Sequence, residues 1–202
     1  VQKRIVSKCI EQAKPVVIAT QVMESMLEMS RPTRAEITDV SNAVLDGADV
    51  IMLSGETSVG KFPFKTVEMM NDIVINAEQH REDRTNNYFM TPDTLQENLF
   101  DSVGKAIVEI SKQINAQAIV VFTFEGRTAR IISKYKPESK IIAISNSFAT
   151  MNNLCLRWGV TSVYREKIDK EHLAIDDAKE LLLSSGLAQK GDLIIFTAGA
   201  PY

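Results

Sequence analysis

Two short apolar runs with a capped helix between them constrain the fold of this 202-residue chain more than any other feature. The runs, residues 15–20 and 48–53, are almost continuously apolar, as is typical of parallel strands that are buried on both faces. Between them, Thr33 and Glu36 form a capping box, which predicts a helix that begins after Thr33. Gly47 follows the last apolar position and can adopt the left-handed conformation that ends a helix. The sequence therefore predicts a strand–helix–strand unit.

The alternation of strands and helices continues along the chain, with one interruption. Helical periodicity at the start of the chain and over residues 63–79 adds further helices to the first unit. Residues 80–98 are mostly polar and have little periodicity, which predicts a linker. We therefore expect one domain at residues 1–83 and a second at residues 84–202.

The second domain has the pattern of a doubly wound α/β sheet. Helices are expected over residues 99–113, 127–135, 148–157 and 174–185, and strands over residues 118–123, 140–145, 162–164 and 193–197. Short strands between helices predict a mostly parallel sheet with right-handed crossovers and helices on both faces. In such sheets ligands bind at the carboxyl ends of the strands.

Composition and charge exclude several classes of protein. Hydrophobic residues make up 45% and charged residues 24% of the chain, which is ordinary for a globular protein. The formal net charge of −3 provides no basic field for nucleic acid or an anionic membrane. No apolar run approaches the roughly 20 residues that span a bilayer, and no secretory pattern opens the chain. We therefore expect no nucleic-acid partner, no membrane association and a cytoplasmic location. Because Val1 stands within a helical pattern, we also expect the chain to come from a longer parent protein.

Four motifs in order carry a resemblance to a known family. They are residues 14–26, 31–36, 39–49 and 54–57, and further matching segments are residues 126–130, 134–137, 186–187 and 190–192. Over essentially the whole chain, these residues closely resemble the pyruvate kinase family. The resemblance implies the last two strand–helix units of a (β/α)8 barrel, followed by a doubly wound, mostly parallel α/β regulatory domain.

The resemblance also implies an activity. The family transfers a phosphoryl group from phosphoenolpyruvate to ADP, which gives pyruvate and ATP in glycolysis, and the assembly it implies is an allosteric homotetramer. In the family, the ligands of Mg²⁺ and K⁺ and the phosphate-binding arginine and lysine lie on earlier barrel strands, before the position of Val1. The resemblance thus implies Mg²⁺ and K⁺ in the intact enzyme, whereas we expect this segment alone to bind neither ion and to be inactive.

Two hydroxyl residues end the predicted barrel strands. Residues at the carboxyl ends of barrel strands face the active site, so Thr20 and Ser54 are expected at the catalytic mouth. The resemblance assigns Thr20 to proton delivery onto the enolate that remains after phosphoryl loss, through a hydroxyl and water relay that Ser54 can join. A threonine hydroxyl is a poor acid and needs such a relay. The alternative is that Thr20 only caps a strand end, and we expect Glu24 and Glu56 to hold loops by hydrogen bonds.

Two arginines flank Pro32 before the capped helix. The resemblance places this loop against a neighbouring subunit near the active-site mouth, which makes Arg31 and Arg34 candidate interface residues. The alternative for Arg34 is a solvated charge in the first turn of the helix, since isolated surface charges contribute little to stability.

A turn in the second domain lies between a predicted strand and the amino end of a helix, where free amides and the helix dipole favour phosphate. It resembles the sugar-phosphate effector loop of the family. The candidate effector-binding residues are Thr123, Glu125, Gly126, Arg127 and Thr128. The family pattern has a serine where Glu125 stands, and a carboxylate there repels phosphate by an energy on the order of 1 to 4 kcal/mol. We therefore expect either a different effector or none.

A different class of function stays open, namely a non-catalytic regulatory or interaction module that binds a phosphometabolite. Two strands cannot close a barrel, so in such a module their apolar faces would need partner chains or other packing. This alternative suits the second domain better than it suits residues 1–80.

Overall fold

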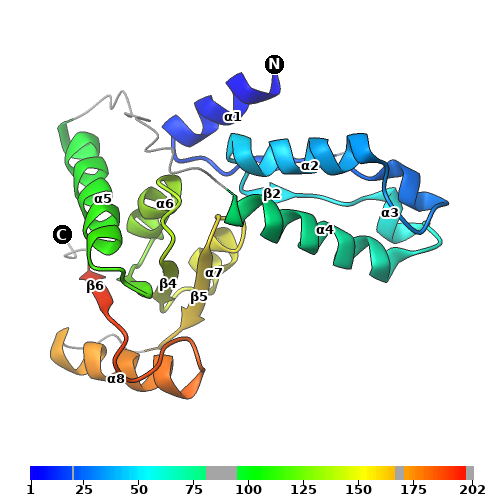
Figure 1. Ribbon diagram of the computed structural model, residues 1–202. Coiled ribbons are helices and arrows are strands. Elements are labelled where there is room, and N and C mark those ends of the chain that lie inside the picture. Colours follow the sequence, from blue (N-terminus) through cyan, green and yellow to red (C-terminus); the bar gives the residue numbers. More distant parts are fainter. Residues whose placement is uncertain (20, 81–94, 167–170, 199–202) are drawn as a thin grey trace. The chain divides into compact units, whose positions relative to one another are not determined.

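The computed structural model describes residues 1–19, 21–80, 95–166 and 171–198 (Figure 1). The chain divides into two compact units, Val1–Phe89 and Met90–Tyr202. The domain boundary that we expected between residues 83 and 84 lies outside the described residues. Among the described residues, no helix combines the length and the hydropathy that crossing a membrane requires.

The first unit is built around the predicted strand–helix–strand element. Val17 pairs with Val50 and Ile18 with Ile51 in a parallel arrangement, as expected for strands joined by a crossover helix. The elements of this unit are α1 (Gln2–Glu11), β1 (Val17–Ile18), the 3-10 helix η1 (Glu24–Leu27), α2 (Arg34–Asp46), β2 (Val50–Ile51), α3 (Gly55–Ser58) and α4 (Pro63–Gln79).

Local sequence signals set both ends of α2. The Thr33 side chain accepts a hydrogen bond from the N–H of Glu36, and the Glu36 carboxylate accepts one from the N–H of Thr33. Gly47 ends the helix with a φ of +101°, which glycine adopts at little cost. The predicted capping box and left-handed helix end are confirmed.

Helices α2 and α4 lie side by side in the first unit (Figure 1). Their contact faces share a buried apolar cluster with the segment that follows β1. The cluster contains Val22, Met23 and Met26 from that segment, Val40 from α2, and Met70 and Ile73 from α4. The segment after β1 is therefore anchored by apolar burial before any polar contact is considered.

The strands of the first unit keep apolar surface exposed. Val17 in β1 is 42% exposed, and Met52, directly after β2, is 44% exposed. Strands of a closed barrel are covered on both faces, so the exposure fits two strands out of a larger barrel.

The second unit is a four-stranded parallel sheet with the strand order β5-β4-β3-β6. The registers include Ala118 opposite both Lys140 and Ile194, and Ile141 opposite Val160. The elements are α5 (Leu95–Gln113), β3 (Ala118–Phe122), α6 (Arg127–Lys134), β4 (Lys140–Ser145), α7 (Phe148–Leu154), β5 (Val160–Tyr164), α8 (Glu171–Ser184) and β6 (Ile194–Ala198).

Each face of this sheet has its own apolar cluster. On one face, residues of α5, α6 and α7 pack on alternate strand positions; the cluster contains Ile107, Ile119, Val121, Ala129, Ile132, Ile141, Ala143 and Leu154. On the other face, α8 and the segment after it pack on the remaining positions; the cluster contains Ala118, Val120, Ile142, Ile144, Ala178, Leu182 and Ala188. The expected doubly wound, mostly parallel fold is confirmed.

Two short helices complete the first unit. Gly55–Ser58 is a helical turn in which the N–H of Ser58 donates to the carbonyl of Ser54. Glu24–Leu27 forms η1, closed by a hydrogen bond from the N–H of Met26 to the carbonyl of Met23.

Candidate functional site

The carboxyl ends of β1 and β2 lie next to each other, because the two strands pair in register. Thr20 belongs to this edge by sequence but lies outside the described residues. Ser54 lies in the loop after β2, is exposed to solvent and occupies the position before the first residue of α3. The strand was expected to run to residue 53, but β2 ends at Ile51, so Ser54 is in the loop and not at the last strand position; its catalytic role stays a prediction.

Glu56 bridges the two loops that leave these strands. Its Oε1 atom accepts a hydrogen bond from the N–H of Met23 at 3.1 Å, and its Oε2 atom accepts one from the N–H of Ser54 at 2.8 Å. The side chain is buried, and the residue is only 3% exposed. We refer to these contacts as the Glu56 bridge. The expectation that Glu56 holds loops by hydrogen bonds is confirmed.

The Glu56 carboxylate stays ionised despite its burial. Burial alone raises the pKa of Glu56, but hydrogen bonds from the backbone N–H groups of Glu56 itself, Ser54, Met23 and Val22 outweigh it, and the pKa lies below the usual value. A carboxylate held in this way is a weak base, because binding a proton would weaken several hydrogen bonds.

Glu36 stabilises the other end of the same segment. Its carboxylate accepts hydrogen bonds from the N–H and hydroxyl groups of Ser25 and of Thr33, with 2.8 Å to Ser25 N and 2.7 Å to Thr33 N. Burial raises the pKa of Glu36, but the hydrogen bonds of Ser25 and Thr33 more than offset this, and the pKa is lowered. The loop from Ser25 to Thr33 is thus held at both ends by one side chain.

Arg31 and Arg34 flank this fixed loop and are both exposed. Exposure is compatible with the expected subunit interface and also with a solvated charge, so the interface stays a prediction for both residues. Glu24, in η1, is likewise exposed.

The predicted effector turn lies at the carboxyl end of β3, next to the ends of β4 and β6. The hydroxyl of Thr123 is directed into the turn, where it accepts a hydrogen bond from the N–H of Gly126 at 2.9 Å. Gly126 has a φ of +77°, and a Cβ atom there would lie 3.1 Å from Leu154 Cδ2 and 3.3 Å from Thr150 Cγ2. Glycine is therefore required at this position for both conformation and space.

The remaining residues of the turn differ in what they present to solvent. Glu125 is exposed, and Thr128 is partly buried in the first turn of α6. The guanidinium carbon of Arg127 lies 4.1 Å from the centroid of the Phe100 ring, a cation–π contact with α5. The structure brings the five predicted residues into one turn and shows Thr123 and Arg127 making contacts within the protein. Effector binding stays a prediction.

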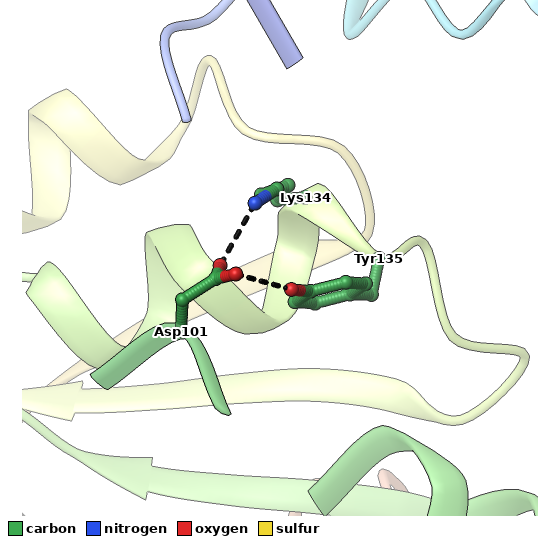
Figure 2. A network of polar contacts seen from close by, with 3 residues as sticks. All are labelled: Asp101, Lys134 and Tyr135. Carbon is green, nitrogen blue, oxygen red and sulfur yellow. Dashed lines mark hydrogen bonds and ion pairs between the residues drawn. The ribbon is translucent and has the colours of Figure 1, made fainter. Parts of the chain in front are cut away.

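A buried polar network in the second unit was not foreseen (Figure 2). Lys134 Nζ lies 2.8 Å from Asp101 Oδ1, and the Tyr135 hydroxyl donates to Asp101 Oδ2 at 2.7 Å. The Lys134 side chain is 0% exposed. Burial, then the hydrogen bond to Asp101 and its negative charge, raise the pKa of Tyr135. The network joins the start of α5 to the end of α6, while the Arg127–Phe100 contact joins α5 to the start of α6.

The described residues offer no set of metal ligands. Among them, His, Cys, Asp and Glu form no group of three or more that could hold a metal ion. Mg²⁺ is bound through carboxylate oxygens together with waters and phosphates. We therefore assign no metal to these residues and derive no step through one.

The fold and the site together define a class of protein. A parallel strand pair followed by a polar loop continues into a doubly wound α/β domain, as in a chain that joins the end of an α/β barrel to a second α/β domain. Comparison with known families agrees: the family described as "Pyruvate kinase, barrel domain" matches residues 1–67, and "Pyruvate kinase, alpha/beta domain" matches residues 101–202. The chain belongs to the pyruvate kinase family.

Individual relatives match along the entire chain. A pyruvate kinase of Geobacillus stearothermophilus is 37% identical over 201 residues, and one of Lactobacillus delbrueckii subsp. bulgaricus is 36% identical over 203 residues. Each alignment covers 100% of this chain and 34% of the relative. The chain thus spans about a third of the length of the curated relatives that it matches.

Solved structures show the same relationship. A crystal structure of a pyruvate kinase from Cryptosporidium parvum matches with a TM-score of 0.90 and 37% identity, covering 98% of this chain and 40% of that chain. A structure described as Cryptosporidium parvum pyruvate kinase in complex with ADP matches with a TM-score of 0.85 and 38% identity, over 98% of this chain and 40% of that chain. The expected last strand–helix units of a barrel followed by an α/β domain are confirmed as the fold.

Proposed function

We propose that the protein to which this chain belongs transfers a phosphoryl group from phosphoenolpyruvate to ADP in the cytoplasm, giving pyruvate and ATP in glycolysis. The observation that carries the proposal is the match of the entire chain to pyruvate kinases at 36–37% identity. One related structure is described as a complex with ADP, which supports a nucleotide substrate.

In this proposal, the first unit contributes to the proton step. Loss of the phosphoryl group leaves an enolate, whose terminal carbon must gain a proton to become the methyl group of pyruvate. Ser54 is exposed in the loop after β2, so its hydroxyl can exchange protons with water at the catalytic mouth. Thr20, which ends the neighbouring strand by sequence, would be the other hydroxyl of the relay.

The segment alone is proposed to be inactive. Phosphoryl transfer depends on neutralising the charge of the phosphate by metal ions and cationic side chains. Mg²⁺ and K⁺ would be bound by parts of the intact enzyme that precede this segment. A coupled assay of pyruvate formation from phosphoenolpyruvate and ADP tests this directly: the full-length protein is expected to be active and the 202-residue segment inactive. Pyruvate formation by the segment would contradict the proposal.

The full-length enzyme also tests the roles of the two hydroxyls. Ser54→Ala and Thr20→Val are each expected to lower kcat by about 10²-fold, which is a typical contribution of a positioned proton donor. Arg31→Ala serves as a comparison, since its proposed role is at a subunit interface of a homotetramer. That substitution should alter the molar mass of the assembly measured by light scattering, with a smaller effect on kcat than the two hydroxyl substitutions have. A Ser54→Ala enzyme with unchanged kcat would remove Ser54 from the relay.

Regulation is proposed for the second unit, with a sugar phosphate at the turn formed by residues 123–128. The support is geometric: the turn lies at the carboxyl end of a central strand, and Gly126 leaves the amino end of α6 without a side-chain cap. Titration with a panel of sugar phosphates, followed by thermal shift, tests the site. Glu125→Ser should increase any stabilisation, because it removes a negative charge beside the phosphate.

A second candidate function is a phosphometabolite-binding module without catalysis. The observation that favours it is the second unit, whose sheet is covered on both faces, whereas β1 and β2 are not. An intact-mass measurement on the protein from its native source discriminates between the two. A mass near 22.5 kDa would favour the module, and a mass severalfold larger would favour the kinase.

A further inference from the structure

The Glu56 bridge assigns one carboxylate oxygen to each of two loops. Oε1 accepts from Met23, in the loop after β1, and Oε2 accepts from Ser54, in the loop after β2. The two partners come from loops that follow different strands, and Met23 is 33 residues before Glu56. A side chain that accepts from both loops fixes the distance between them.

Neither an amide nor a shorter acid can reproduce this geometry. An ionised carboxylate has two oxygens that only accept, whereas the Gln side chain has one accepting oxygen and one donating NH₂ group. In a Gln side chain, the NH₂ group would face a backbone N–H, and one of the two loops would lose its partner. Asp keeps both oxygens, but its chain is one methylene shorter.

We propose that Glu56 is a positioning residue for the reaction, which holds Ser54 and the loop at Met23 in the relative arrangement that proton delivery requires. The inference rests on the proposed function, because it assigns Ser54 to the proton step. It extends that function to a buried residue whose proposed action is through Ser54 and the loop at Met23. The lowered pKa of Glu56 means that the bridge is intact at neutral pH.

Glu36 is a matched control within the same unit. It is also a carboxylate that accepts backbone hydrogen bonds, from Ser25 at 2.8 Å and Thr33 at 2.7 Å, and its pKa is also lowered. Its partners are Ser25 in η1 and Thr33 before α2, and they include neither Met23 nor Ser54. Glu36→Gln therefore removes the same chemical group and a similar number of hydrogen bonds without acting on Ser54.

The test uses the full-length enzyme with three variants: Glu56→Gln, Glu56→Asp and Glu36→Gln. Three quantities are measured for each: kcat and KM for phosphoenolpyruvate, stability in urea, and exchange of the pyruvate methyl hydrogens with deuterated water. In the exchange, a methyl C–H bond breaks, its electron pair forms the enolate, and a deuteron is returned to the same carbon. The rate of this exchange therefore measures the proton step separately from phosphoryl transfer.

A positioning role predicts that Glu56→Gln lowers kcat and the exchange rate by tenfold or more, with KM changed less than threefold. A displacement of the order of 1 Å is sufficient for such a loss. Glu56→Asp should lie between the parent and Glu56→Gln, and it takes the place of Glu56→Gln if that variant does not fold. Glu36→Gln should reduce stability but leave both rates within twofold of the parent.

Three outcomes would overturn the inference. A folded Glu56 variant with kcat and exchange within twofold of the parent would show that the bridge is only structural. Equal losses of rate in Glu56→Gln and Glu36→Gln would assign the effect to stability. A parent enzyme without phosphoryl transfer would remove the proposed function and this inference with it, and the assay of the parent alone separates that case from the other two.

Discussion

The two units of the chain are stabilised in different ways. The second unit covers both faces of a four-stranded sheet with helices, and its central strands β3 and β4 are almost completely buried. The first unit has a two-stranded sheet with exposed apolar side chains, and the carboxylates of Glu56 and Glu36 hold its loops. The comparison shows that the second unit has a core around a covered sheet, whereas the apolar clusters of the first unit leave part of its strand pair exposed.

The largest effect is expected when the units are separated. Residues 90–202 expressed alone should unfold in a single cooperative transition, because both apolar clusters lie within them. Residues 1–89 alone should show no cooperative transition, since a two-stranded sheet is marginal in water. Circular dichroism during heating and urea titration measures both. A sharp transition in residues 1–89 would contradict the comparison.

The next largest effect is expected at the buried network of the second unit. Asp101→Ala leaves the buried Lys134 ammonium and the Tyr135 hydroxyl without this carboxylate, which should cost about 3 to 5 kcal/mol of unfolding free energy. Asp176→Ala removes an exposed pair with Lys179 and should cost less than about 1 kcal/mol. Urea denaturation gives both values. Equal losses in the two variants would mean that burial does not determine how much an ion pair contributes to the free energy of unfolding.

A smaller effect is expected at the effector turn. Gly126→Ala should destabilise the second unit by about 2 to 4 kcal/mol, because the left-handed backbone is strained for alanine and the added Cβ contacts Leu154. Gly186→Ala is the control, since its φ is +68° but the described residues place nothing within 4 Å of the added Cβ. It should cost about 1 kcal/mol. If the two costs agree, space at the turn is not limiting.

The smallest expected effect is that of pH on stability. Acid should destabilise the first unit, and alkali should destabilise the second. The lowered pKa values of Glu56 and Glu36 contribute stability above the usual value of 4.5, which is lost as the pH falls through the lowered values. The raised pKa of Tyr135 contributes stability below the usual value of 10.0, and this is lost as the pH rises above it.

Hydrogen exchange at several pH values measures both trends. Amides of the first unit should lose protection first in acid, and amides of α5 and α6 should lose it first in alkali. In a Glu56→Gln variant the acid dependence of the first unit should become shallower. If the acid dependence of amide protection is the same in Glu56→Gln as in the parent, Glu56 does not contribute to that dependence.

Features with a local cause could be predicted from the sequence. The capping box at Thr33, the helix end at Gly47 and the apolar strand at residues 140–145 each depend on neighbouring residues, and all three are found where they were expected. Helix α4 likewise has the predicted bounds of Pro63 and Gln79. The order of these elements predicted an α/β fold, and the family resemblance implied that the first unit is the end of a barrel.

Features that depend on distant residues could not be predicted. The partners of Asp101 lie 33 and 34 residues away, and the sequence does not indicate that they meet. Arg127 was named as a candidate effector-binding residue, but the sequence does not indicate that its guanidinium group lies over Phe100 in α5. The sequence suggested that Glu56 holds a loop, but not that its carboxylate accepts hydrogen bonds from two loops at once. That property depends on the pairing of β1 with β2.

The Glu56 bridge also has a consequence for the order of folding. It joins residues 33 apart, so its formation closes a long loop, and we expect it to follow the formation of α2 and the pairing of β1 with β2. Contacts that form after the rate-limiting step affect the unfolding rate rather than the folding rate. Loss of the bridge should therefore shorten the lifetime of the folded first unit while leaving its rate of formation nearly unchanged. The residue that we propose to align the proton step would then also set how long that alignment lasts.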